Sequence, residues 1–201
     1  MLPSPRSDLH QLQLFPKELL RGSSRNICGD MAERCTEKLT GGKRLKTDCR
    51  IPFCPDIECE NHCCEVKSVR HGSKTILYQH RIEKEKAFTA EGGVLEYWFW
   101  IHKANFKKCE TEDDVRQAWA RGIHCVCIID FPSILRLIEK KETETINNSY
   151  YSNHSPNGVF KGSGWLLPTR VLIETCKAAT NIEDLQVLKN SIKPFQLYRR
   201  H

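Results

Sequence analysis

Residues 56–67 read Asp-Ile-Glu-Cys-Glu-Asn-His-Cys-Cys-Glu-Val-Lys, and this stretch decides the fold and the chemistry expected of the chain. A reversal at Glu60-Asn61 would make it a β-hairpin in which Asp56 faces Glu65. Directly opposed residues of an antiparallel pair have Cβ atoms about 4.5–5.5 Å apart, where two like charges repel. The hairpin therefore predicts a pair of carboxylates that a divalent cation would stabilise.

A lysine joins this pair, because side chains alternate along a strand. Lys67 falls on the same face as Glu65, while Val66 turns into the core. Hydrolysis of a phosphodiester needs a cation that polarises the phosphate, an activated water and neutralisation of developing charge. Carboxylate ligands suit Mg²⁺, with Mn²⁺ as a substitute. The alternative interpretation is a surface hairpin whose acids and lysine are merely solvated.

Composition bounds the class of protein. The chain has 201 residues, 28% of them charged, a net charge of +6 and eleven cysteines. Such a chain fits one substantial globular domain, and its basic balance permits a polyanionic partner. It contains no run of about 20 apolar residues and no apolar signal-peptide core, so we expect no membrane association and an intracellular location, either the cytoplasm or the nucleoid or nucleus. The odd cysteine count then favours reduced thiols.

The pattern of elements predicts an α/β fold, a mixed β-sheet flanked by helices. Helices are expected over residues 26–39, 75–90, 112–122 and 132–141, and strands over 94–102 and 123–131, beside the hairpin. Four segments follow: an irregular leader at 1–25, a core at 26–141, a polar loop or linker at 142–164, and a helical C-terminal segment at 165–201.

The spacing of Pro55-Asp56 and Glu65-Val66-Lys67 resembles that of the PD-(D/E)xK nuclease superfamily, with the closest likeness to archaeal-type Holliday junction resolvases and related phage or restriction endonucleases. The likeness covers about residues 26–106 and implies a restriction-endonuclease-like core. It implies that Asp56 and Glu65 bind the metal, that the Val66 carbonyl and Glu33 assist, and that Lys67 is catalytic.

The same resemblance implies a Mg²⁺-dependent endonuclease acting on double-stranded or branched DNA, of a junction-resolving or a restriction or repair type. A junction-resolving role would further imply a homodimer. The many cysteines of the hairpin depart from the family pattern.

Basic residues on both sides of the hairpin are the predicted DNA contacts, because Lys and Arg bind backbone phosphates. The predicted contacts are Lys43, Arg44, Lys46, Arg50, Lys74, Arg81 and Lys84. An ordinary solvated surface is the competing interpretation, since Glu83 and Glu85 reduce the positive charge of the basic residues that follow the hairpin.

The cysteines support a rival function, a non-catalytic nucleic-acid- or protein-binding module with a zinc-bound hairpin. Zinc takes four Cys or His ligands in structural sites, usually from paired C-x₂-C knuckles. The candidates here are Cys49, Cys54, Cys59, His62, Cys63 and Cys64, and no C-x₂-C pair occurs among them. Free cysteines that pack as small hydrophobic residues are the simpler interpretation.

Overall fold

A central mixed β-sheet organises the protein. The computed structural model describes residues 17–45, 53–146, 149–151, 159–161 and 163–176. The five-stranded sheet has the order β1-β2-β3-β5-β6, with β1 Lys43–Arg44, β2 Ile57–Glu58, β3 Cys63–Arg70, β5 Leu95–His102 and β6 Ile123–Asp130. Strands β3 and β5 are parallel and the other pairs are antiparallel. The chain is therefore an α/β protein with a mixed sheet flanked by helices, as predicted.

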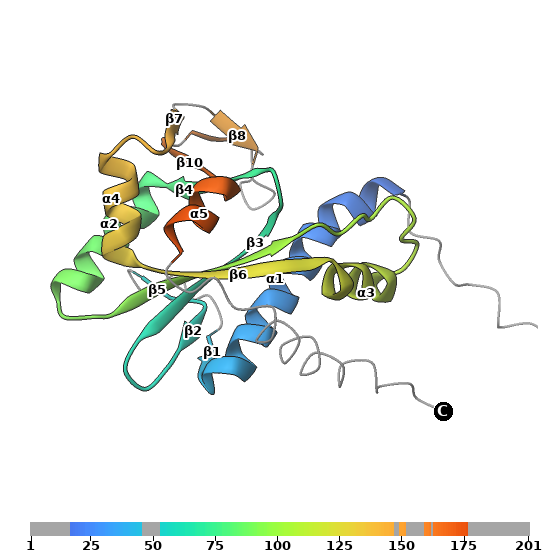
Figure 1. The fold of residues 1–201 in the computed structure, drawn as a ribbon, viewed down its shortest axis with the longest axis horizontal. Helices are drawn as coiled ribbons and strands as arrows, with labels where there is room; N and C mark the ends of the chain where they lie inside the picture. Colours follow the sequence, from blue (N-terminus) through green and yellow to red (C-terminus); the bar gives the residue numbers. More distant parts are fainter. Residues whose placement is uncertain (1–16, 46–52, 147–148, 152–158, 162, 177–201) are drawn as a thin grey trace, which may run out of the picture.

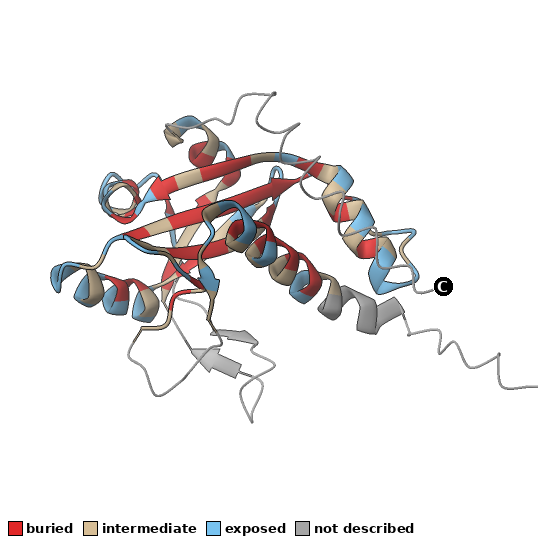
Figure 2. Ribbon diagram, turned by 90° about the horizontal axis from the view of Figure 1, so that it is seen from below, coloured by how far each residue is buried: buried red, intermediate tan, exposed pale blue. Residues whose placement is uncertain are grey.

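Helices cover both faces of this sheet (Figure 1). Helices α1 Lys17–Thr40 and α3 Glu112–Gly122 pack on one face. Helices α2 Gln79–Ala90, α4 Phe131–Glu139 and α5 Thr169–Thr175 contribute to the core on the other. Figure 2 shows that the buried residues concentrate in the central strands and on the helix sides that face them. None of the helices in the described part of the chain has the length and hydrophobicity that a membrane span requires.

The aromatic strand β5 divides its side chains between the two cores. Trp98 and Trp100 belong to the core on the α1 side. Tyr97 and Phe99 belong to the core on the α2 side. This alternation follows from the two-residue period of a strand.

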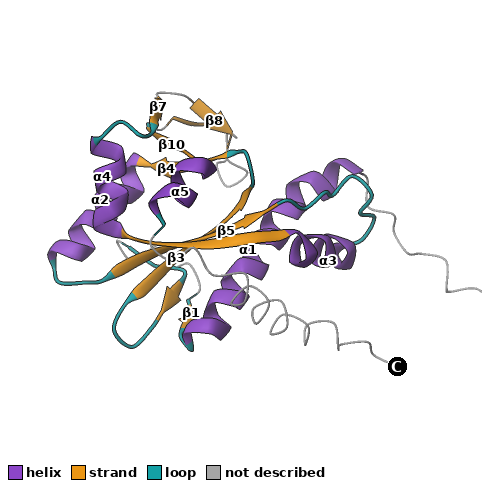
Figure 3. Ribbon diagram, viewed as in Figure 1, coloured by secondary structure: helices purple, strands orange, loops and turns teal. Residues whose placement is uncertain are grey.

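Two smaller sheets lie outside the central one (Figure 3). The first has the order β4-β10-β7, with β4 Lys74–Tyr78, β10 Gly164–Pro168 and β7 Glu144–Ile146. The second pairs β8 Ser149–Tyr151 with β9 Val159–Lys161. Gly164 permits the close pairing of β10 with β4, because a Cβ at this position would lie 2.4 Å from the Leu77 carbonyl oxygen.

Several predicted segments need correction. Residues 17–25 are helical rather than part of an irregular leader, because α1 begins at Lys17. Residues 75–78 belong to strand β4, so the predicted helix starts only at Gln79. The predicted loop at 142–164 contains strands, and the C-terminal segment begins with a strand before the short helix α5. The part of the predicted helical C-terminal segment beyond residue 176 lies outside the described residues.

Candidate functional site

The β2–β3 hairpin has the predicted register. Ile57 pairs with Cys64 and Glu58 with Cys63. The Cys59 N–H donates to the His62 carbonyl at 2.9 Å, which closes the reversal at residues 60 and 61. One position further along, the Asp56 N–H donates to the Cys64 carbonyl at 3.1 Å. Asp56 is thus brought beside Glu65, as the count of residues predicts.

The Asp56 side chain closes an open edge of β3. Its Oδ2 accepts a hydrogen bond from the Val66 backbone N–H at 2.7 Å. The ladder between β2 and β3 ends at Ile57, so no residue of β2 pairs with Val66. In an extended strand the N–H and C=O of one residue point the same way, so the Val66 carbonyl also faces this edge. A carboxylate and a backbone carbonyl, both oxygen donors that Mg²⁺ accepts, therefore share one edge.

Glu65 is completely buried and is balanced by two cations. Its Oε1 accepts a hydrogen bond from Lys67 Nζ, and its Oε2 accepts one from Arg81 Nη2. The side chains of Lys67 and Arg81 keep 28% and 34% of their surface exposed. Both oxygens of the buried carboxylate are therefore paired with partly exposed cationic groups.

Burial and neighbouring charges have opposing effects on the pKa values of Asp56 and Lys67. Burial, and next the charge of Glu65, raise the pKa of Asp56 to about 7, although Lys67, the Val66 N–H and Arg81 act to lower it. Burial lowers the pKa of Lys67, but the charges of Glu65 and Asp56 outweigh this effect and leave it above its ordinary value. Lys67 is therefore cationic at neutral pH and acts as a hydrogen-bond donor rather than as a neutral base. The raised pKa of Asp56, caused first by burial and second by the charge of Glu65, is consistent with a cation-binding role.

Glu85 and Tyr97 extend the cluster, and sequence reasoning missed both. Glu85 is completely buried on α2 and accepts a hydrogen bond from the Tyr97 hydroxyl at 2.6 Å. Arg81 Nε lies 3.5 Å from the other Glu85 oxygen. Burial raises the pKa of Glu85 to about 7. The i,i+4 spacing of Arg81 and Glu85 was the available signal, because such pairs meet on a helix surface.

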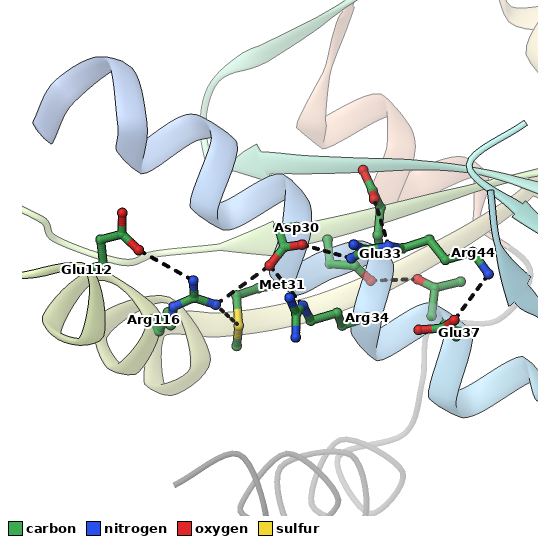
Figure 4. A network of polar contacts seen from close by, with 10 residues as sticks. Asp30, Met31, Glu33, Arg34, Glu37, Arg44, Glu112 and Arg116 are labelled. Carbon is green, nitrogen blue, oxygen red and sulfur yellow. Dashed lines mark hydrogen bonds and ion pairs between the residues drawn. The ribbon is translucent and has the colours of Figure 1, made fainter. Parts of the chain in front are cut away.

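Glu33 approaches the cluster from α1. Arg44 Nε lies 3.7 Å from the Glu33 carboxylate, and Arg44 Nη1 lies 2.8 Å from Asp30 (Figure 4). Burial raises the pKa of Glu33, and the charges of Arg44, Asp30, Glu65 and Lys67 also act on it. Glu33, the acid predicted to assist, is thus within electrostatic reach of Glu65 and Lys67.

The predicted DNA contacts have different surroundings. Arg44 and Arg81 are engaged by acids of the chain, whereas Lys43 and Lys84 are exposed on β1 and α2. Lys74 lies in the second sheet, where its Nζ is 2.5 Å from a Glu144 oxygen. Lys46 and Arg50 lie outside the described residues.

The hairpin also gathers a second set of metal-ligating groups. Ligand atoms of Cys59, His62 and Cys64 all lie within 4.8 Å of one another. Of the other predicted zinc ligands, Cys54 and Cys63 are outside this group and Cys49 is outside the described residues. All cysteines in the described part of the chain are free thiols.

Comparison with known proteins gives no assignment. No family model matches the chain, and no curated protein shows significant similarity to it.

Proposed function

We propose that the chain is a metal-dependent DNA endonuclease that hydrolyses phosphodiester bonds at Asp56, Glu65 and Lys67. One observation carries this function: the hairpin register sets Asp56 beside Glu65, and Lys67 donates a hydrogen bond to Glu65. The resemblance to PD-(D/E)xK nucleases rests on the same residues. The order α1, then β1, β2 and β3, then α2 and β5, with β3 parallel to β5, is compatible with the core that this resemblance implies.

The residues present suit Mg²⁺, with Mn²⁺ as a substitute. Asp56 and Glu65 would hold the ion, together with the Val66 carbonyl and with help from Glu33, and all of these donors are oxygens. When bound, the ion supplies positive charge that polarises the phosphate. It would also offset the charge of Glu65, which together with the larger effect of burial raises the pKa of Asp56.

The chain's own cations have distinct tasks in this proposal. Lys67, cationic and partly exposed, would orient the attacking water and offset charge on the phosphate. Arg81 holds the second oxygen of Glu65 and fixes the direction of that carboxylate. Lys43 and Lys84 would contact the DNA backbone, as would Lys46 and Arg50. Among nuclease subtypes we favour a junction-resolving enzyme that acts as a homodimer. A restriction or repair nuclease is the second choice.

A cleavage assay tests the proposal. Branched and linear duplex DNA are incubated with the full chain in Mg²⁺, Mn²⁺ or EDTA, beside the variants Asp56→Ala and Lys67→Ala. We expect metal-dependent cleavage that each variant reduces by roughly 100-fold or more, as loss of an electrostatic catalytic group does. Glu58→Ala is the matched control, because Glu58 is an exposed acid of the same hairpin. Absence of metal-dependent cleavage on every substrate, or full activity in both variants, would overturn the assignment.

The alternative is a non-catalytic nucleic-acid- or protein-binding module whose hairpin binds zinc. The proximity of Cys59, His62 and Cys64 favours the zinc part of this function. The same assay separates the two functions, because a binding module would cleave no substrate in any metal.

A further inference from the structure

The tip of the β2–β3 hairpin brings three metal-ligating side chains together, two thiols and one imidazole. Cys59 and His62 flank the reversal, and Cys64 follows on β3. Their ligand atoms lie within 4.8 Å of one another, and the two sulfur atoms are 3.9 Å apart. The sequence separates the thiols by four residues, and it is the hairpin register that makes them neighbours.

The distance between the sulfurs matches a shared metal ion. With Zn–S bonds of about 2.3 Å and a tetrahedral angle, two thiolates on one zinc lie about 3.8 Å apart. A disulfide would require about 2.05 Å. The side chains of Cys59 and Cys64 are therefore already separated as two ligands of one ion would be.

The surroundings hold these ligands in place. Cys64 is completely buried, whereas Cys59 and His62 are partly exposed and leave a path from solvent. Gly42 packs directly on Cys59, since a Cβ at position 42 would lie 2.7 Å from its sulfur. The backbone just before β1 therefore restricts where this sulfur can move.

Glu96 provides the outer partner that a metal-bound histidine commonly has. One of its oxygens lies 3.7 Å from His62 Nε2 and also accepts a hydrogen bond from Trp98 Nε1 at 3.2 Å. A carboxylate beside the second nitrogen of a ligating histidine fixes the orientation of the ring. Strand pairing places Glu96 directly opposite Cys64, so this carboxylate is positioned by the sheet itself.

We infer that Cys59, His62 and Cys64 form a Zn²⁺ site with three protein ligands and a solvent molecule in the fourth position. This site is separate from the acidic cluster around Asp56 and Glu65. The two sites differ in chemistry, because thiolate and imidazole select zinc whereas carboxylate oxygens select Mg²⁺. Cys64 and Glu65, which are adjacent on β3, also point to opposite faces of the sheet. Cys64 belongs to the core on the α1 side. Tyr97 pairs with Glu65 in the sheet and donates its hydroxyl to Glu85, and it belongs to the other core.

The zinc ion would act as a clamp on the hairpin. It would join the two arms at the tip and fix the pairing of Ile57 with Cys64. A slip of one residue would turn Asp56 to the other face of the sheet, away from Glu65. The clamp would therefore maintain the register on which the acidic cluster depends.

Metal analysis of the full chain tests this site. Protein purified with Zn²⁺ and passed through a desalting column is expected to retain about one zinc ion per chain by elemental analysis. Cys59→Ser and His62→Ala are expected to lower the affinity for Zn²⁺ by about 10-fold or more. Cys63→Ser is the matched control, because Cys63 is a neighbouring cysteine outside the group, and it should retain full stoichiometry. Far-ultraviolet circular dichroism confirms that each variant is folded.

Cobalt gives a second readout. Co²⁺ in place of zinc should give the visible d–d bands and thiolate charge-transfer absorption of a tetrahedral site, and these should be lost in Cys59→Ser but kept in Cys63→Ser. Trace zinc in the unmodified chain with no such spectrum, or undiminished zinc in both ligand variants, would overturn the site. The zinc result is independent of nuclease activity, since Asp56→Ala should bind zinc normally.

Discussion

The Asp56 carboxylate accepts a hydrogen bond from the Val66 backbone N–H, with 2.7 Å between Oδ2 and the nitrogen. This contact holds Asp56 beside Glu65 at the point where β2 has ended and β3 continues. Burial and the charge of Glu65 both disfavour ionisation of Asp56. An acid that is fixed where its charge is unfavourable is more typical of a functional site than of a purely structural one.

Asp56→Asn should remove part of the pH dependence of stability. The pKa of Asp56 rises from 3.8 to about 7 on folding, so the folded state binds the proton more tightly than the unfolded state. Stability from this group is complete at low pH and is lost as the pH rises toward 7, at about 1.4 kcal/mol for each pKa unit. Urea unfolding in EDTA at about pH 5 and about pH 8 measures the effect.

We expect the original chain to lose more free energy of unfolding than Asp56→Asn between these two pH values. Mg²⁺ at the higher pH should then stabilise the original chain and leave the variant unchanged, because a ligand stabilises only the state that binds it. Parallel pH profiles for the two proteins would contradict the raised pKa of Asp56.

Glu85→Ala should be strongly destabilising, although the residue lies on a helix rich in charged side chains. The change leaves the buried Tyr97 hydroxyl without its acceptor and opens a cavity beside Arg81. Such losses cost about 2–4 kcal/mol in the free energy of unfolding. Glu83→Ala, two residues away and exposed, should change it by less than about 0.5 kcal/mol. Equal effects of the two substitutions in urea unfolding would mean that Glu85 is not held in the cluster.

The hairpin register could be predicted because its determinants are local. Two residues form the reversal, and alternation along the strand then assigns each side chain to a face. Strand β4 shows the opposite case. Residues 74–78 pair with β10, which begins at Gly164, so their strand conformation depends on a segment far along the chain. Local periodicity alone predicts a helix that already begins at residue 75, because it carries no information about this distant partner strand.

The site could be predicted only in part for a similar reason. Asp56, Glu65 and Lys67 share one hairpin, so their spacing alone brings them together. Arg81 was expected on the surface as a DNA contact. In the structure α2 lies close enough to β3 for Arg81 to form an ion pair with Glu65. The burial of Glu85 depends on the crossover between β3 and β5, which the helix sequence by itself does not encode.

Thr36→Val should loosen α1 from the central sheet. The Thr36 hydroxyl accepts a hydrogen bond from Trp100 Nε1 at 2.8 Å, and both residues are completely buried. Valine keeps the shape but leaves the indole N–H unpaired, at a cost of about 1–3 kcal/mol. Thr89→Val is the control, because Thr89 bonds only to carbonyls of its own helix and should cost about 0.5 kcal/mol or less. Urea unfolding followed by tryptophan fluorescence gives both values, and a Thr36→Val cost no larger than that of the control would contradict this coupling.

Glu33→Gln should weaken the use of Mg²⁺ if Glu33 assists the acidic cluster. The charges of Glu65 and Lys67 act on Glu33, so its carboxylate belongs to the same electrostatic neighbourhood. Loss of such an assisting group typically lowers metal affinity or activity by about 10–100-fold. Glu37→Gln is a matched control one turn further along α1, because Glu37 also contacts Arg44, through the Arg44 backbone N–H.

Cleavage rates measured over a range of Mg²⁺ concentrations separate the two variants. We expect Glu33→Gln to need a higher Mg²⁺ concentration for half-maximal rate, and Glu37→Gln to follow the curve of the original chain. A shift of the same size in both variants would assign the effect to Arg44 and the packing of α1. In that case Glu33 would be a structural partner of Arg44, and the metal would be held by the hairpin alone.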